Sequence, residues 1–115
     1  MLTSEFWKGI RYFKPEEFSS PDAPLSGAAL MSGTLIALLD RARGLAGIPF
    51  KVTSGYRTPE HNTAVGGASE SAHLTGQGVD IAALHPHTRF KVLLALFLVG
   101  FTRVEIAPRH IHVDV

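Results

Sequence analysis

Apolar residues recur at helical spacing in two stretches of the chain. Between Ala28 and Ala42 they fall three or four positions apart, and Gly44 and Gly47 close the segment. This pattern predicts a helix. The stretch Thr88–Val99 is almost entirely apolar and is followed by a glycine, which predicts a second long helix. Its most apolar run, about ten residues, is far shorter than the roughly 20 residues that a membrane span requires.

Four shorter stretches have the composition of strands, and one segment begins like a short helix. The strands are expected over residues 49–53, 79–82, 103–107 and 110–115. Thr58 offers an N-cap, Pro59 suits the first helical position and Glu60 places an acid in the first turn. A short helix is therefore expected to run to about Ala64. Helices segregated from a small antiparallel sheet predict an α+β domain.

Residues 1–27 have the composition of an irregular arm. This region is interrupted by Pro15, Pro21, Pro24 and Gly27. It also holds five aromatic residues: Phe6, Trp7, Tyr12, Phe13 and Phe18. Proline and glycine are the residues that most often end regular elements. We interpret the aromatic residues as anchors that pack the arm on the rest of the domain, rather than as a ligand-binding strip.

Composition and charge exclude several classes of function. The chain has 115 residues with 45% apolar, enough for one packed domain over residues 1–115. The 11 Lys+Arg and 10 Asp+Glu give a net charge of +1, which is not the basic surface of a nucleic-acid-binding protein. The absence of cysteine excludes disulfides, thiolate nucleophiles and cysteine-based zinc sites. We expect a monomer that does not bind nucleic acid and has no integral membrane segment.

Histidine is the unusual residue, with six in the chain. In the last predicted strand, polar and apolar residues alternate strictly, and side chains two apart in a strand lie on the same face. His110, His112 and Asp114 therefore lie together, opposite a fully apolar face. Two histidines and an aspartate gathered in this way favour a metal-binding or catalytic role.

The preceding strand, 103–107, must place its apolar residues against the same core. That requirement sets the register, since a slip of one residue would turn the apolar side chains to solvent. The predicted cross-strand pairs are Ile106 with Ile111, Glu105 with His112, and Arg103 with Asp114. We expect the last pair to be an ion pair, whereas Glu105 suits either a cross-strand ion pair or the chemistry of the site.

A second group of polar residues lies in the segment 69–82. His73 and Asp80 are separated by six residues that include two glycines, so the chain can turn between them. Val79 and Ile81 are expected to point to the core, which turns Asp80 the other way. Imidazole nitrogen and carboxylate oxygen both suit zinc, and two histidines with one aspartate leave a fourth position open for water, as a catalytic zinc site requires.

Three blocks of the sequence resemble the signatures of a known enzyme family. SGYRTPEHN (54–62), SAHLTGQGVDIA (71–82) and RHIHVDV (109–115) look like those of the zinc D-Ala-D-Ala carboxypeptidases, the fifteenth metallopeptidase family, in the same order and spacing. The family includes phage endolysin peptidases, vancomycin-resistance D,D-dipeptidases and, more distantly, the Hedgehog signalling domain. The resemblance extends from about Tyr12 to the last residue. It implies the Hedgehog/DD-peptidase fold, one zinc ion per chain and a peptidoglycan peptide with D-amino acids as substrate.

The resemblance also implies roles for individual residues. His73, Asp80 and His112 match the positions of the zinc ligands. Arg57 matches the family's contact to the substrate and the oxyanion, with a structural ion pair as the alternative role. Ser71 precedes the first ligand as it does in the family, where it would hydrogen-bond the peptide.

The general base is where this sequence departs from the family. Many members carry an acid three residues before the last ligand, but Arg109 stands there. Glu105 is the carboxylate that the predicted hairpin places on the site face, and His110 matches a position where several members have a histidine near the bound water. Either residue is a candidate base. The same departure leaves open a non-catalytic zinc-bound binding or structural module, Hedgehog-like or part of a phage virion.

The expected function is therefore zinc-dependent hydrolysis of cell-wall peptides, as a D,D-carboxypeptidase or an endopeptidase. The N-terminus has no basic stretch followed by an apolar one, so we expect no signal peptide. This fits a phage-type lysis enzyme that is cytoplasmic until released to the cell wall. It equally fits a fragment of a longer exported protein.

Overall fold

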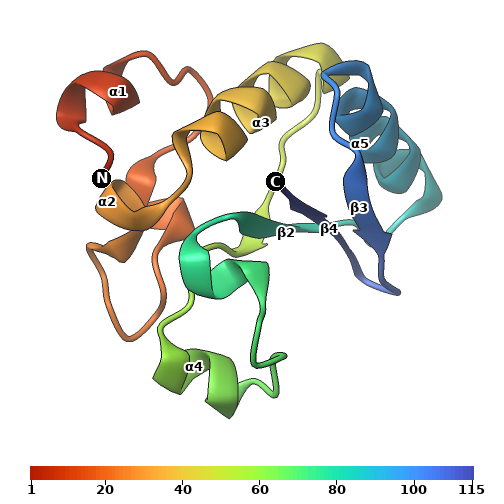
Figure 1. The fold of residues 1–115 in the computed structure, drawn as a ribbon. Coiled ribbons are helices and arrows are strands. Elements are labelled where there is room, and N and C mark those ends of the chain that lie inside the picture. The colour runs from red at the N-terminus through yellow and green to blue at the C-terminus, as the bar shows by residue number, and fades with distance from the viewer.

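One antiparallel sheet organises the C-terminal half of the molecule (Figure 1). Its strands lie in the order β1–β2–β4–β3, with bounds Val52–Ser54, Gly78–Ala82, His110–Asp114 and Arg103–Ile106 respectively. The computed structural model describes residues 1–115. The sheet and the helices beside it confirm the α+β class. The register predicted for the last hairpin is also confirmed, with Glu105 opposite His112 and Arg103 opposite Asp114.

The two long helices cover the apolar face of this sheet. α3 (Gly33–Ala46) and α5 (Pro86–Leu98) pack against each other, and their inner faces join the sheet in a single hydrophobic cluster. On the sheet side, the cluster includes the alternating residues Val79, Ile81, Ile111 and Val113, each at most 1% exposed. The polar residues between them therefore lie on the opposite face. None of the helices has the length and apolar content that crossing a membrane needs.

The helix predicted over residues 28–42 is in fact two helices. α2 (Ser26–Leu30) ends before Met31, which is extended with ψ of 150°. Ser32 then caps α3, because its side chain accepts a hydrogen bond from a backbone N–H of the first turn. The apolar periodicity continues through the break, so the pattern alone did not indicate it.

The ends of the long helices also differ from the prediction. Gly44 lies inside α3, and only Gly47 ends it, with a left-handed φ of 67°. α5 begins two residues earlier than expected, since Pro86 occupies its first helical position. The short helix α4 (Pro59–Ala64) begins as predicted, and the Thr58 side chain caps it by accepting from the His61 N–H.

The N-terminal arm holds more regular structure than its composition predicted. It forms α1 (Ser4–Lys8) and the 3-10 helix η1 (Pro15–Phe18). Phe13 and Phe18 lie in the main core, and the Phe18 carbonyl accepts a hydrogen bond of 2.8 Å from the Tyr56 N–H. The arm thus holds the segment after β1, which leads to the polar face of the sheet.

Candidate metal centre

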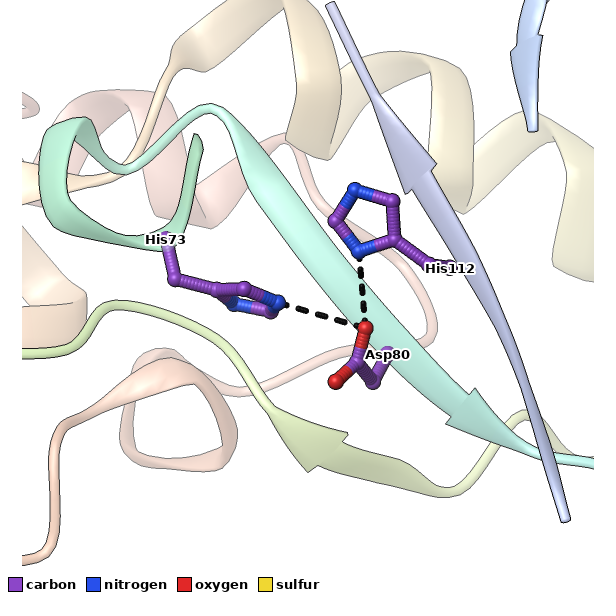
Figure 2. A group of neighbouring side chains, drawn as sticks. All are labelled: His73, Asp80 and His112. Carbon is purple, nitrogen blue, oxygen red and sulfur yellow. Dashed lines mark hydrogen bonds and ion pairs between the residues drawn. The ribbon is translucent and has the colours of Figure 1, made fainter. Parts of the chain in front are cut away.

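Three metal-competent side chains meet on the polar face of the sheet (Figure 2). Asp80 comes from β2, His112 from its neighbour β4, and His73 from the 3-10 helix η2 (Ala72–Thr75). One potential ligand atom from each lies within 4.8 Å of the others. These are the three residues that the family resemblance implies as ligands.

Local structure explains how each side chain reaches this point. Asp80 and His112 are direct cross-strand partners, so the alternation of the strands turns both to one face. His73 lies in a turn capped by Ser71, whose hydroxyl accepts from the His73 N–H at 3.2 Å. Gly78 leaves room for the second imidazole, because a Cβ there would lie 3.0 Å from His112 Cε1.

The hydrogen bonds of His73 orient one ring nitrogen for a metal. Its Nδ1 lies 2.7 Å from the Gly55 carbonyl oxygen, which can only accept, so Nδ1 carries the proton. In the neutral ring, Nε2 then presents a lone pair toward Asp80 Oδ1, 3.2 Å away. Two lone-pair atoms that face each other favour a cation between them. With the imidazole of His112 beside them, the donor set is one that zinc uses.

The charges of the site reinforce one another. Burial disfavours the carboxylate of Asp80, but its contacts with the imidazoles of His112 and His73 outweigh that effect and lower its pKa well below the ordinary value. The pKa of His112 is raised in the metal-free protein, because its protonated ring can donate to Asp80, the main cause, and also to Asp114. Asp80 is therefore ionised across the neutral range, as a ligand must be.

Arg57 is held at the edge of the centre by three partners. Its Nε donates to Ser54 Oγ at 3.0 Å, and one terminal nitrogen donates to Asn62 Oδ1 at 3.2 Å. The other terminal nitrogen lies 3.4 Å from Asp80 Oδ2. The ion pair considered from the sequence is thus present, with Asp80 as the partner.

Sequence reasoning missed the supports of Arg57. Ser54 and Asn62 both belong to the block 54–62, but no role was assigned to either. Asn62 is only 4% exposed, and its amide nitrogen donates to the Ala68 carbonyl at 2.9 Å. An asparagine inside a short, mostly polar helix gives no signal of burial, since its partners Arg57 and Ala68 lie in the segments on either side of the helix.

A cavity of about 490 Å³ opens over the three potential ligands. Its lining includes all residues to which the sequence gave a ligand, substrate or base role: Arg57, Ser71, His73, Asp80, Glu105, His110 and His112. Asp114, which shares the face of His110 and His112, is not part of this lining. His110 Nε2 lies 3.8 Å from Asp80 Oδ2, and Glu105 lies across from His112. Arg109 is exposed and is not part of the lining.

Comparison with known families covers nearly the whole chain. Residues 11–114 match the family described as Peptidase M15. No curated protein matches the chain.

Proposed function

Since the chain belongs to the peptidase M15 family, we propose that it hydrolyses peptide bonds with one zinc ion held by His73, Asp80 and His112. M15 peptidases are zinc-dependent metallopeptidases. The observation that supports the proposal most is the convergence of three suitable ligand atoms within 4.8 Å. These atoms face a cavity large enough to admit a peptide chain end or a short peptide segment.

Zinc bound at such a centre lowers the pKa of a coordinated water toward about 7 and polarises a carbonyl group. His73, Asp80 and His112 would hold the ion, and the cavity over them would give water and the peptide access to it. His73 and His112 each reach the centre with one ring nitrogen and use the other for a hydrogen bond to the protein. That arrangement keeps the rings oriented before the metal arrives.

We propose that Arg57 binds the negative charge of the substrate. Its contacts with Ser54 and Asn62 hold the guanidinium plane in place. An arginine fixed in this way can stabilise the oxyanion that develops on the scissile carbonyl, or bind a terminal carboxylate. Ser71 lines the same cavity, and its hydroxyl can donate to the peptide while it accepts from the His73 N–H.

Proton transfer is assigned to Glu105 or His110. Either group would take a proton from the attacking water and pass it to the amine that leaves when the peptide bond breaks. Both line the cavity. Glu105 lies on the strand beside His112, and His110 lies two residues before it on the same face.

The proposed substrate is a cell-wall peptide with D-amino acids, cut as a D,D-carboxypeptidase or an endopeptidase. This class of substrate comes from the resemblance of the three signature blocks. The test is digestion of purified muropeptides by zinc-loaded protein, with mass spectrometry of the products. We expect one peptide bond to be cut, and His112→Ala to abolish both zinc content and cleavage.

A second candidate is a zinc-bound module that binds such peptides without cutting them. Arg109 at the position where many members have the acidic base favours it. The same digestion separates the two. If the zinc-loaded parent binds muropeptides but leaves them intact, the binding module is correct and the peptidase is not.

Glu105→Gln and His110→Ala distinguish the two candidate bases. Glu105→Gln keeps the shape and polarity of the side chain but removes its basicity. If Glu105 is the base, this variant keeps zinc and loses a factor of about 10² to 10⁴ in turnover, while His110→Ala is milder. The opposite ranking would assign the proton transfer to His110.

A further inference from the structure

Asp114 touches a potential metal ligand without being one itself. Its Oδ2 lies 2.8 Å from His112 Nε2, on the side of the ring that faces away from Asp80. The Asp114 side chain is 12% exposed and also accepts a hydrogen bond from Arg103 Nε. From the sequence, this aspartate was expected to share a face with His110 and His112 and to form an ion pair with Arg103. Its direct contact with the His112 imidazole is seen in the structure alone.

The hydrogen-bonding capacity of a carboxylate determines what this contact does. An ionised carboxylate only accepts, so the proton it receives must be on His112 Nε2. Nδ1 lies 2.8 Å from Asp80 Oδ1, and a metal ion bound between these two atoms would require the neutral ring, whose lone pair is then on Nδ1. Nδ1 is the atom that points to the metal centre.

The two histidines would therefore reach the metal through different nitrogens. His73 has its proton on Nδ1, bound to the Gly55 carbonyl, and offers Nε2. His112 has its proton on Nε2, bound to Asp114, and offers Nδ1. A neutral acceptor holds the first ring, whereas a charged acceptor holds the second, and a charged acceptor makes the stronger hydrogen bond.

Arg103 holds Asp114 in place from the edge strand. The two residues are direct cross-strand partners in β3 and β4. The guanidinium is largely exposed, with 69% of its side chain accessible, so Arg103 contributes little to the core. Its hydrogen bond instead orients the carboxylate toward the imidazole.

We propose that Asp114 is a positioning residue for metal binding. Asp114 keeps the proton of His112 on Nε2 and so directs Nδ1 to the metal, while Arg103 holds Asp114 in that orientation. The inference rests on the proposed function, because it requires His112 to be a ligand. Asp114 acts through the imidazole and does not touch the substrate. Loss of such an outer partner typically weakens metal binding 10- to 100-fold.

The experiment measures zinc affinity by competition with a chromogenic chelator. Asp114→Ala removes the acceptor, and we expect affinity to fall about 10- to 100-fold. Asp114→Asn keeps an acceptor oxygen but removes the charge, so zinc affinity should fall less in this variant than in Asp114→Ala. Arg103→Gln, at an exposed position, should weaken binding in the same direction without disturbing the fold.

Nitrogen NMR of the histidine rings gives a second readout that does not depend on activity. In the zinc-loaded parent, we expect the remaining proton of His112 on Nε2 and that of His73 on Nδ1. In Asp114→Ala, the Nε2 proton should exchange faster with water, while the His73 signals stay unchanged. A merely structural ion pair would leave the His112 ring signals as they are in the parent.

Asp40→Asn is the matched control. The Asp40 carboxylate accepts from the Arg11 and Tyr12 N–H groups at 3.0 and 2.8 Å, and it does not line the site cavity. This change should lower stability but leave zinc affinity unchanged. If Asp114→Ala binds zinc like the parent while His112→Ala does not, the positioning role is wrong and the metal centre stands. If His112→Ala also binds like the parent, the metal centre itself is misplaced.

Discussion

Replacement of Arg57 by lysine tests the part of the proposed mechanism that depends most on geometry. The change keeps a positive charge but removes the planar fork of donors. In the structure, the three nitrogens of the guanidinium donate separately to Ser54 Oγ, Asn62 Oδ1 and Asp80 Oδ2, at 3.0, 3.2 and 3.4 Å. A lysine ammonium is a single point and cannot keep all three contacts and the same position.

The expected magnitude follows from the contact that would be lost in the transition state. A hydrogen bond to a charged group contributes about 1.5–3 kcal/mol, and each 1.4 kcal/mol is a factor of ten. We therefore expect Arg57→Lys to lower kcat/KM for a muropeptide by roughly 10- to 100-fold. The ligands remain in place, so zinc content should stay at the level of the parent.

The assay combines turnover with elemental analysis of the same samples. Arg41→Lys serves as the control, because Arg41 is exposed on α3 and does not line the cavity; it should leave both values unchanged. Unaltered turnover in Arg57→Lys would refute the substrate role and leave only the ion pair with Asp80. A fall in zinc content would instead show that Arg57 serves to hold the ligand Asp80.

Four further predictions concern the stability of the fold around the site. Gly76→Ala should lower the free energy of unfolding by more than about 2 kcal/mol, because φ is 71° and a Cβ would lie 1.9 Å from the Leu30 carbonyl oxygen. Gly66→Ala, at φ of 72° with open space around it, should cost only about 1–2 kcal/mol, and equal losses in urea denaturation would refute the steric argument. Phe18→Ala, at a fully buried position, should cost about 3–5 kcal/mol in the same assay. The raised pKa of His112 means that its protonation stabilises the metal-free protein below about pH 6.5. This stabilisation is lost as the pH rises through the folded-state pKa. Urea denaturation of the metal-free protein over a pH series should show that loss, and the same series on His112→Ala should lack it.

The last hairpin was predictable because several constraints agreed there. Strict alternation in residues 110–115 assigned one face to the core, and a short connection joined the two strands. Together these favoured the register that puts Val104 and Ile106 on the same side as Ile111 and Val113. Val104 packs against the core as expected, whereas Ile106, near the end of the edge strand, is 60% exposed. Local pattern and long-range pairing pointed to the same answer, and the structure has that register.

Other features depend on contacts that no local pattern contains. The break at Met31–Ser32 lies inside continuous apolar periodicity, and the Ser32 N–H bonds to the Gly76 carbonyl, far along the chain, at 2.8 Å. The order of the strands, with β2 beside both β1 and β4, is likewise set by packing. The contact between Asp114 and His112 depends on side-chain rotamers, since strand alternation shows only that the two share a face.

The sequence separation of the three potential ligands has a consequence for a chain without cysteine. A metal held by His73, Asp80 and His112 would tie η2, β2 and β4 together, as a disulfide does in other small domains. Links that close long loops restrict the unfolded chain most, and a ligand at 100 times its Kd adds about 2.7 kcal/mol to the stability of the form that binds it. The loaded chain should resist heat and proteolysis better than the metal-free chain, and a chelator should act as a reducing agent does on a disulfide-bonded domain.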